Sequence, residues 1–193
     1  MNIMVVGCGK IGTTILESLV DEGHNVTAVD NDQAALTEVT NVHDVMGICG
    51  NGADCETLEE AGVSKIDLFV AVTGSDEVNM LSCFLAGKMG AAHTIARIRK
   101  PEYNDRSLDF MKQQLGLAMA INPDQLAAHE LYHILRLPSA AKVETFSRRN
   151  FEMIELRLKN DSPLLGVPLN ELRTRYQAKF LIGVVQRGDR VYI

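Results

Sequence analysis

The feature that most constrains the fold of this chain is a glycine-rich segment close to its N-terminus, NIMVVGCGKIG over residues 2–12. Four apolar residues lead directly into Gly7-x-Gly9-x-x-Gly12, and the apolar residues of the following TTILESLVDEG recur at the spacing of a helix. The segment therefore predicts a strand, a tight glycine turn and the start of a helix.

Each glycine has a physical reason in such a turn. Gly7 permits a sharp exit from the strand, Gly9 has no Cβ to obstruct a pyrophosphate, and Gly12 lets the helix pack close to the strand. The free N–H groups and positive dipole end of the helix then face the phosphates. A second apolar run ends in Asp30, 18 residues after Gly12, where an acid accepts hydrogen bonds from an adenosine ribose. This context favours a nucleotide site over the alternative of a purely structural turn.

Composition limits the class of protein. The 193 residues suit one domain of ordinary size plus a smaller unit. A formal net charge of −6, without a long basic run, argues against a nucleic-acid partner. No apolar run is long enough to cross a bilayer and no basic region precedes the first apolar residues, so we expect a cytoplasmic protein. The cysteines lack CxxC spacing, which favours free thiols over a metal site or disulfides.

Six apolar runs alternate with helical segments, which predicts an α/β fold with a doubly wound, parallel, six-stranded Rossmann sheet. The expected strands are residues 3–6, 25–29, 45–49, 66–72, 93–98 and 117–121. Expected helix caps are Asn31 or Asp32, and Ser75 or Asp76. Ligands of such sheets bind beyond the carboxyl ends of the strands. The loops expected to share that edge are Gly7–Gly12, Asp30, 50–54, 73–76 and Arg97.

The helix expected over residues 77–89 has apolar residues at three-to-four spacing, namely Val78, Leu81, Leu85 and Met89. A further helix is expected over residues 124–137, ended by Pro138. Its apolar residues on one side are Leu126, Leu131, Ile134 and Leu135. His129 and His133 form an i, i+4 pair, for which a solvated face or a subunit contact is favoured over a metal site.

Beyond Pro138 the pattern changes to strands, expected over residues 142–146, 151–158 and 180–186, with a hairpin turn at Gly188-Asp189. Residues 166–172 suggest a short helix with Pro168 in its first turn. We therefore expect a nucleotide-binding domain over 1–122, a crossover helix over 123–138 and the start of a small α+β lobe over 139–193. The abrupt end inside an apparent hairpin suggests a fragment of a longer chain.

A dehydrogenase needs a proton donor or acceptor beside its substrate, supplied by a second domain that closes over the nicotinamide. Tyr103 and Lys112 lack a YxxxK spacing, and His129 and His133 lie on a connecting helix. We therefore expect no catalytic residue and no metal, and a fold that binds a nucleotide without reacting on it. The alternative is an NAD-dependent oxidoreductase whose substrate residues come from missing sequence or a partner. A DNA-binding redox regulator is disfavoured by the net charge and by the lack of a helix-turn-helix pattern.

Five motifs carry a family resemblance across the chain: GCGKIG with Asp30, GNGADCETLEEAGV, DLFVAVTGSDEVNMLSCFLAG, IARIRKPEY and INPDQLAAHEL. In this order they resemble RCK domains, the regulators of K+ conductance, of the TrkA type found in cytosolic subunits of Trk potassium uptake systems. The resemblance implies a sensor that binds NAD(H) or ATP and ADP and gates a membrane potassium channel subunit. It also implies a homodimer or higher ring through the crossover helix, held at the inner face of the cell membrane by the channel.

The resemblance also implies roles for single residues. Phosphates would lie on Gly7–Gly12, ribose hydroxyls on Asp30, adenine beside Ala53 and Asp54, the other end of the ligand at Thr73 and Gly74, and a phosphate on Arg97. Lys10 and Arg99 would meet a terminal phosphate. The full candidate set is Gly7, Cys8, Gly9, Lys10, Ile11, Gly12, Asp30, Asn31, Asn51, Gly52, Ala53, Asp54, Thr73, Gly74, Arg97 and Arg99.

Two points in this comparison stay open. The family commonly has GDAxD after its third strand, whereas Asn51 and Gly52 break that pattern, so a carboxylate role at position 51 is not expected. Arg97 has the alternative of pairing with Asp76 or Glu77, and residues 73–74 have the alternative of being only a tight turn.

Overall fold

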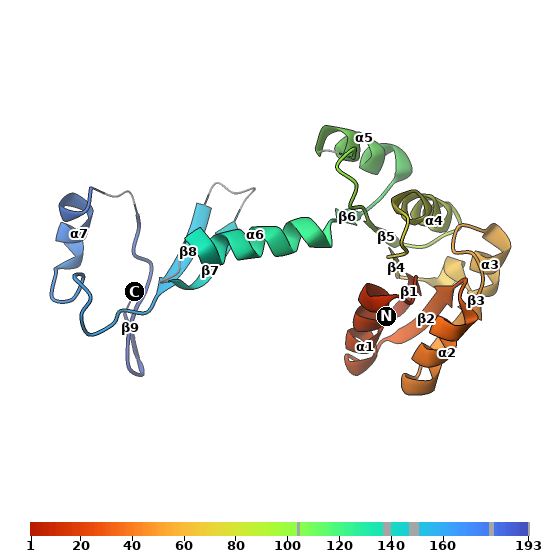
Figure 1. Ribbon diagram of the computed structural model, residues 1–193, viewed down its shortest axis with the longest axis horizontal. Coiled ribbons are helices and arrows are strands. Elements are labelled where there is room, and N and C mark those ends of the chain that lie inside the picture. Colours follow the sequence, from red (N-terminus) through yellow and green to blue (C-terminus); the bar gives the residue numbers. More distant parts are fainter. Residues whose placement is uncertain (104, 137–139, 147–150, 178–179, 193) are drawn as a thin grey trace. The chain divides into compact units, whose positions relative to one another are not determined.

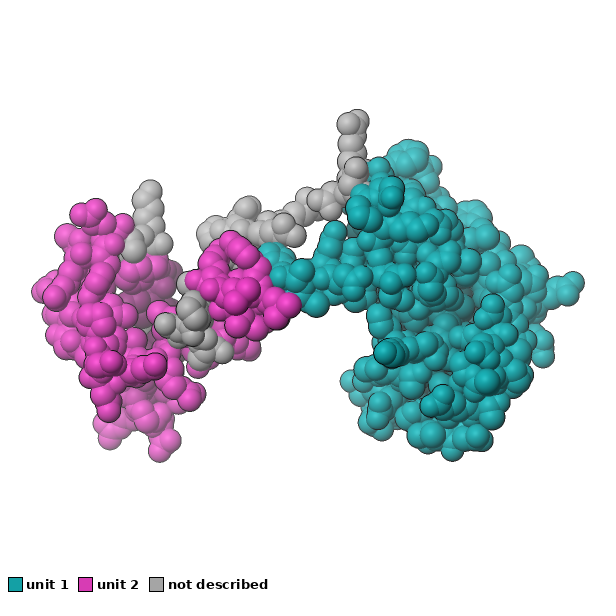
Figure 2. Space-filling view, viewed as in Figure 1, with its two compact units in different colours: residues 1–129 teal, residues 130–193 magenta. Residues whose placement is uncertain are grey.

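A computed structural model describes residues 1–103, 105–136, 140–146, 151–177 and 180–192 of the protein. The chain divides into two compact units, Met1–His129 and Glu130–Ile193, coloured separately in Figure 2. Each unit has its own sheets, so each is described by itself. Within the described residues, no helix combines the length and the apolar character needed to span a bilayer.

The first unit is built on one parallel sheet of six strands (Figure 1). Its strands are β1 (Asn2–Val6), β2 (Asn25–Asp30), β3 (Met46–Cys49), β4 (Leu68–Ala71), β5 (His93–Arg97) and β6 (Met119–Ile121). They lie in the order β3-β2-β1-β4-β5-β6, so the chain reverses direction across the sheet between β1 and β4. This order confirms the doubly wound Rossmann sheet that the sequence predicts.

Helices cover both faces of the sheet. Helices α1 (Lys10–Asp21) and α2 (Gln33–Val42) pack on one face, where Leu16 and Leu36 are buried among residues of β1, β2 and β4. Helices α3 (Cys55–Glu60) and α4 (Asp76–Lys88), with α5 (Asp105–Leu115) at the border, pack on the other face around Phe69. A 3-10 turn, η1 (Val63–Lys65), leads into β4. The apolar strands are therefore covered on both sides, as a buried parallel sheet requires.

Side-chain caps fix the helix starts at the carboxyl edge of the sheet. Asp32 accepts a hydrogen bond from the backbone N–H of Ala34 at the start of α2. Ser75 accepts one from the N–H of Val78 at the start of α4. Of the alternatives that the sequence left open, Asp32 and Ser75 are thus the caps.

The buried side of α4 follows the apolar spacing of its sequence only in part. Leu81 is exposed and Val78 only half-buried, whereas the buried residues are Asp76, Asn79, Met80, Ser82, Cys83 and Ala86. Leu85 and Met89 of the apolar spacing do pack against the core, but the helix also buries Asp76 and Asn79, whose polar side chains bind the backbone at the ends of neighbouring strands. Hydrophobic spacing does not detect such residues.

The second unit begins within α6 (Pro123–Arg136), the helix along which the chain passes from one unit into the next. It contains an antiparallel pair, β7 (Ala140–Phe146) and β8 (Phe151–Leu156), helix α7 (Leu169–Arg175), and a hairpin of β9 (Val185–Arg187) and β10 (Arg190–Tyr192). Pro168 lies at the N-cap of α7. The strand expected over 180–186 was wrong for residues 180–184, and the strand expected to reach residue 158 ends at Leu156.

Candidate functional site

The glycine turn has the geometry that its sequence predicts. Gly7 has a φ of +103°, and an added Cβ would lie 2.9 Å from the backbone nitrogen of Thr73. A Cβ on Gly12 would lie 1.7 Å from the carbonyl oxygen of Gly7, so only glycine lets α1 pack this close to the turn. A Cβ on Gly9 would meet nothing within 4 Å, which leaves the backbone there open to a ligand.

The start of α1 is suited to an anion. Gly9 is its N-cap, and the helix has neither a side-chain cap nor an acidic residue in its first turn, all of which lies in the described part of the chain. The first N–H groups of the helix therefore have no side-chain acceptor, and its positive dipole end is not neutralised locally. Lys10 is exposed in this turn and Ile11 is half-buried beside it.

Asp30 connects the end of β2 to the glycine turn. Its Oδ2 accepts a hydrogen bond from the N–H of Cys8 at 2.5 Å, and its Oδ1 accepts one from the N–H of Asp32 at 2.8 Å. A carboxylate has about four acceptor positions, so these two bonds leave room for ribose hydroxyls. Asn31, also predicted as a contact, is exposed next to it.

Cys8 contributes its backbone, not its thiol. Burial, and secondarily the charge of Asp30, raises the pKa of the Cys8 thiol to about 12. Burial likewise raises the pKa of Cys83 to about 12. Cys49 and Cys55 are exposed, and all four thiols are free. A buried thiol that stays protonated at neutral pH is a poor nucleophile.

The loop between β3 and α3 explains both departures from the family pattern. The Oδ1 of Asn51 accepts a hydrogen bond from the N–H of Ala53 at 3.0 Å, which shapes the turn without a charge. Gly52 is buried, and a Cβ there would lie 2.1 Å from Cγ1 of Val6. Asp54 caps α3 by accepting from the N–H and hydroxyl of Thr57 at 2.9 and 3.0 Å, and these bonds lower the pKa of Asp54.

Asn79 organises the loop after β4, a role that sequence reasoning missed. It is 0% exposed. Its Oδ1 accepts from the N–H and hydroxyl of Thr73 at 2.8 and 2.7 Å, and its Nδ2 donates to the carbonyl oxygens of Arg97 at 2.9 Å and Thr73 at 3.3 Å. One amide thus joins the ends of β4 and β5. The only sequence signal was a polar residue one turn into α4, on its inner side.

Asp76 makes a second connection that the sequence did not reveal. Its carboxylate is 2% exposed, and its Oδ2 accepts from the N–H groups of Arg99 at 2.8 Å and Lys100 at 2.7 Å. The guanidinium of Arg99 donates to the carbonyl oxygen of Gly74 at 3.1 Å. The loop after β5 is therefore held against the first turn of α4.

The charge partner of Glu77 is Lys100 and not Arg97. The carboxylate of Glu77 forms an ion pair with Lys100 and accepts from the hydroxyls of Tyr103 at 3.1 Å and Ser75 at 2.9 Å. The bond from Lys100, followed by the bonds from the backbone N–H of Glu77 itself and from the two hydroxyls, lowers the pKa of Glu77 from its ordinary 4.5 to about 2. The same contact raises the pKa values of Lys100 and Tyr103.

Arg97, at the carboxyl edge of the sheet, has a hydrogen-bond donor that is not used. Its Nη1 lies 3.4 Å from the carbonyl oxygens of Val72 and Thr73, which are long hydrogen bonds. Among the described residues, its buried Nε has no hydrogen-bond partner. A buried, unsatisfied donor of a cation is rare in native structures and is satisfied when an anion or water binds.

The structure thus brings most of the predicted residues to one edge. The turn of Gly7 contacts Thr73, Cys8 contacts Asp30, Arg97 contacts Thr73, and Arg99 contacts Gly74. The loop after β3 joins them because the N–H of Gly50 donates to the carbonyl oxygen of Asp30 at 2.9 Å. Lys10 is exposed at the start of α1 and is connected to this edge through the backbone of the turn.

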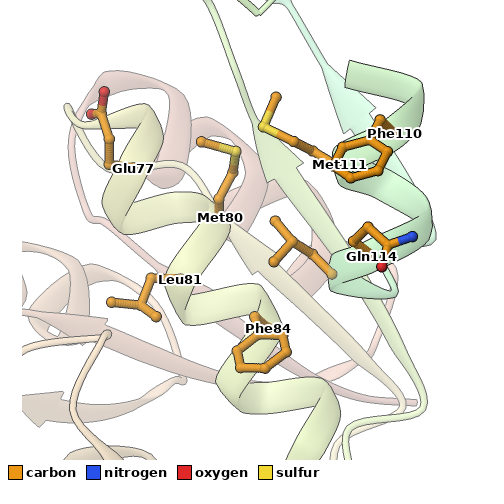
Figure 3. Close-up of a pocket in the computed structure, with 8 residues that line it drawn as sticks. Glu77, Met80, Leu81, Phe84, Phe110, Met111 and Gln114 are labelled. Atoms are coloured by element: carbon orange, nitrogen blue, oxygen red, sulfur yellow. The ribbon is translucent and has the colours of Figure 1, made fainter. Parts of the chain in front are cut away.

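A pocket of about 380 Å³ lies elsewhere, between α4 and α5. Figure 3 shows Met80, Leu81 and Phe84 on one side and Phe110, Met111 and Gln114 on the other, with Glu77 at one end. It contains none of the predicted nucleotide contacts, and its apolar lining does not suit phosphates. Within the described part of the chain, no cluster of three or more His, Cys, Asp or Glu residues is arranged to hold a metal. The side chain of His133, half of the predicted histidine pair, lies outside the described residues.

The chain is similar in sequence to known proteins. The model of the TrkA-N domain family matches residues 3–123. The chain is 29% identical to the Trk system potassium uptake protein TrkA homolog of Methanothermobacter thermautotrophicus, over 99% of this chain and 85% of that protein. It is 37% identical to the TrkA homolog of Archaeoglobus fulgidus, over 89% of this chain but only 39% of that protein. These names describe transport components, which supports the expectation of a protein that is not an enzyme.

Solved structures share the fold at lower identity. The TrkA-N domain of the inner membrane protein ybaL from Escherichia coli has a TM-score of 0.61 at 16% identity, over 69% of this chain and 96% of that one. The Shewanella denitrificans Kef CTD in its AMP-bound form has a TM-score of 0.58 at 19% identity, over 73% and 84%. The GsuK channel bound to NAD has a TM-score of 0.53 at 17% identity, over 62% and 21%.

Proposed function

This chain belongs to the TrkA-N domain family, and from that membership we propose that it binds an adenine nucleotide at the carboxyl edge of its sheet to regulate a membrane potassium transporter. The observations that carry the proposal are the open glycine turn, where nothing lies within 4 Å of a Cβ built on Gly9, and Arg97 at the end of β5, whose Nε has no described partner. An exposed backbone and an unsatisfied cation at one edge are what a phosphate group requires.

The ligand we propose is NAD(H), with ATP or ADP as the alternative at the same site. Both share an adenosine end, for which Asp30 offers ribose acceptors and residues 50–54 a neighbouring loop. A negative carboxylate at this position disfavours a 2′-phosphate, hence NADP. Phosphates would lie over Gly7–Gly12, and Arg97, Arg99 and Lys10 would meet the more distant ones. In support, the GsuK channel, a fold neighbour, has been solved with NAD bound, and the Kef CTD, another, with AMP bound.

The partner we propose is a membrane channel subunit of the Trk type, with this chain at its cytoplasmic face. The relatives named as potassium uptake proteins support this assignment. A regulatory subunit acts on a channel by binding its ligand unequally in two states. A thousandfold preference supplies about 4 kcal/mol per site, enough to change the gate equilibrium when several sites act together.

We further propose that two copies pair through α6. One side of this helix exposes large apolar side chains, with Leu131 at 60% and Leu135 at 78%. Leu126 and Ile134 continue the same side at 61% and 57%. A row of four exposed leucine and isoleucine side chains on one helix marks an interaction surface, and a second copy of α6 presents a matching row.

The test is the binding of nucleotides to a variant that changes only the turn. Gly9→Ala adds a methyl group where nothing lies within 4 Å, at a φ of −71° that alanine adopts freely. It should leave the fold intact and weaken binding at least tenfold, because the methyl group occupies the phosphate path. Titration calorimetry with NADH, NAD, ATP and ADP measures this.

Gly183→Ala is the matched control, since a Cβ at Gly183 also meets nothing within 4 Å but lies in the second unit. It should bind as the wild type does. Binding of Gly9→Ala equal to the wild type would place the ligand elsewhere, and a wild-type protein that binds none of the four nucleotides would overturn the proposal.

A further inference from the structure

One residue of the candidate nucleotide edge is tied to the start of α6. The main chain of Arg99 is held on both sides: its N–H donates to the buried carboxylate of Asp76 at 2.8 Å, and its carbonyl oxygen accepts from Nδ2 of Asn122 at 3.2 Å. Its guanidinium meanwhile reaches the carbonyl oxygen of Gly74 at the edge. Arg99 therefore connects the loop after β4 with the residue that follows β6.

Asn122 is at the same time the cap of α6. Its Oδ1 accepts from the N–H of Gln125 at 3.1 Å, and its carbonyl oxygen accepts from the N–H of Leu126 at 3.1 Å. The oxygen and the nitrogen of this one amide group thus bind two different segments of the chain. The oxygen side holds the first turn of the helix, and the nitrogen side holds the loop that carries Arg99.

We propose that this amide is a relay, through which a nucleotide held by Arg99 changes the stability of the first turn of α6. The inference rests on the proposed nucleotide site and deepens it by naming the contact through which a bound nucleotide affects the rest of the protein. A ligand anion that binds the guanidinium fixes the Arg99 backbone between Asp76 and Asn122. The Asn122 amide then loses freedom, and the capped turn opens less often.

The surroundings favour this route. Asp76 cannot follow the loop, because it is 2% exposed at the start of α4. The backbone of Ile98 also pairs with the end of β6, its N–H donating to the carbonyl oxygen of Ile121 at 2.9 Å. Among the described residues, a movement of Arg99 is therefore transmitted most directly to Asn122, where a single side-chain hydrogen bond joins the loop to the helix.

Asn122→Asp separates the relay from the cap. Aspartate keeps an oxygen for the N–H of Gln125 and is an equally good N-cap, but it cannot donate to the Arg99 carbonyl. Asn25→Asp is the matched control, because Asn25 also donates one side-chain hydrogen bond, to Oδ1 of Asn2 at 3.1 Å, at the opposite edge of the sheet.

The experiment measures amide hydrogen exchange at Gln125 and Leu126, by NMR of the whole chain, with and without saturating NADH or ATP. In the wild type and in Asn25→Asp, nucleotide should raise the protection of these amides about fivefold or more. In Asn122→Asp, nucleotide should raise the protection of these amides less than about twofold. The nucleotide affinity of this variant should fall by the factor by which the effect of nucleotide on protection has decreased. A purely structural role would instead lower protection already without nucleotide.

The two proposals fail differently. If the wild type binds nucleotide in calorimetry but its Gln125 and Leu126 amides do not respond, or if Asn122→Asp responds as the wild type does, the relay is overturned and the nucleotide site stands. If the wild type binds none of the nucleotides, the proposed function is overturned and the relay falls with it.

Discussion

The carboxylate of Asp30 accepts a hydrogen bond from the backbone N–H of Cys8, with 2.5 Å between Oδ2 and the nitrogen. The residue predicted to bind a ribose is thus also the residue that positions the phosphate-binding turn. Loss of this side chain should therefore affect folding and binding together.

Asp30→Ala should lower the free energy of unfolding by about 1–3 kcal/mol, because the N–H of Cys8, a buried residue, loses its acceptor. Nucleotide affinity should fall about tenfold or more, about 1.4 kcal/mol. Urea unfolding and calorimetry measure the two effects. Asp44→Ala, which removes the same charge from an exposed position, should change neither. An Asp30→Ala protein that binds as tightly as the wild type would exclude a ribose contact.

Gly12→Ala should destabilise the protein by about 3 kcal/mol or more, since the new Cβ would lie 1.7 Å from a backbone oxygen that cannot rotate away. Gly9→Ala is the comparison, with an expected change within about 0.5 kcal/mol. The denaturant midpoints of the two variants measure this difference in stability. Equal stability of the two variants would mean that α1 shifts to accommodate the methyl group.

The ion pair of Glu77 with Lys100 should be visible in the pH dependence of stability. Because the pKa of Glu77 is lowered from 4.5 to about 2 in the folded state, its contribution is complete above pH 4.5 and is lost as the pH falls toward 2. The wild type should therefore be more stable than Glu77→Gln at pH 7, and the two should converge near pH 2. The difference should shrink in high salt, because both side chains are half exposed.

Thermal unfolding from pH 2 to 7 tests this expectation, with Glu60→Gln on the exposed end of α3 as the control. A pH-independent gap between the wild type and Glu77→Gln would show that the side chain acts through packing and not through its charge.

Leu131→Lys should dissociate the proposed dimer without unfolding the chain, because the side chain is 60% exposed and a lysine there costs little in the monomer. Light scattering coupled to gel filtration measures the mass. Gln125→Lys, an exposed position on the other side of α6, should leave the dimer intact. A wild-type protein that is monomeric at tens of micromolar would contradict pairing through this helix.

The sequence predicted the carboxyl edge of the sheet well where the structure depends on neighbouring residues in the chain. Gly7, Gly9 and Gly12 act through backbone geometry, which a short motif encodes completely. Asp30 follows from its place at the end of an apolar run. The order of the strands follows from the alternation of strands and helices, with right-handed crossovers.

The rest depended on contacts between distant segments. Asn79 and Asp76 are buried because they bind the backbones of Arg97, Arg99 and Lys100, about 20 residues further along the chain. The apolar periodicity of α4 includes Leu81, which is exposed, and misses Asp76 and Asn79, because it counts hydrophobic residues and takes no account of hydrogen-bond partners. Similarly, the apolar run over 180–184 is not a strand in the structure, although its composition is apolar, because a strand also needs a partner that the local sequence does not reveal.

The amide of Asn79 joins the ends of β4 and β5 with hydrogen bonds in which it both donates and accepts. An aspartate would offer only acceptors, and its bonds would weaken with acid and with salt. A neutral amide does not titrate and is not screened. The spacing between Thr73 and Arg97 is therefore set by an uncharged connection that does not change with pH.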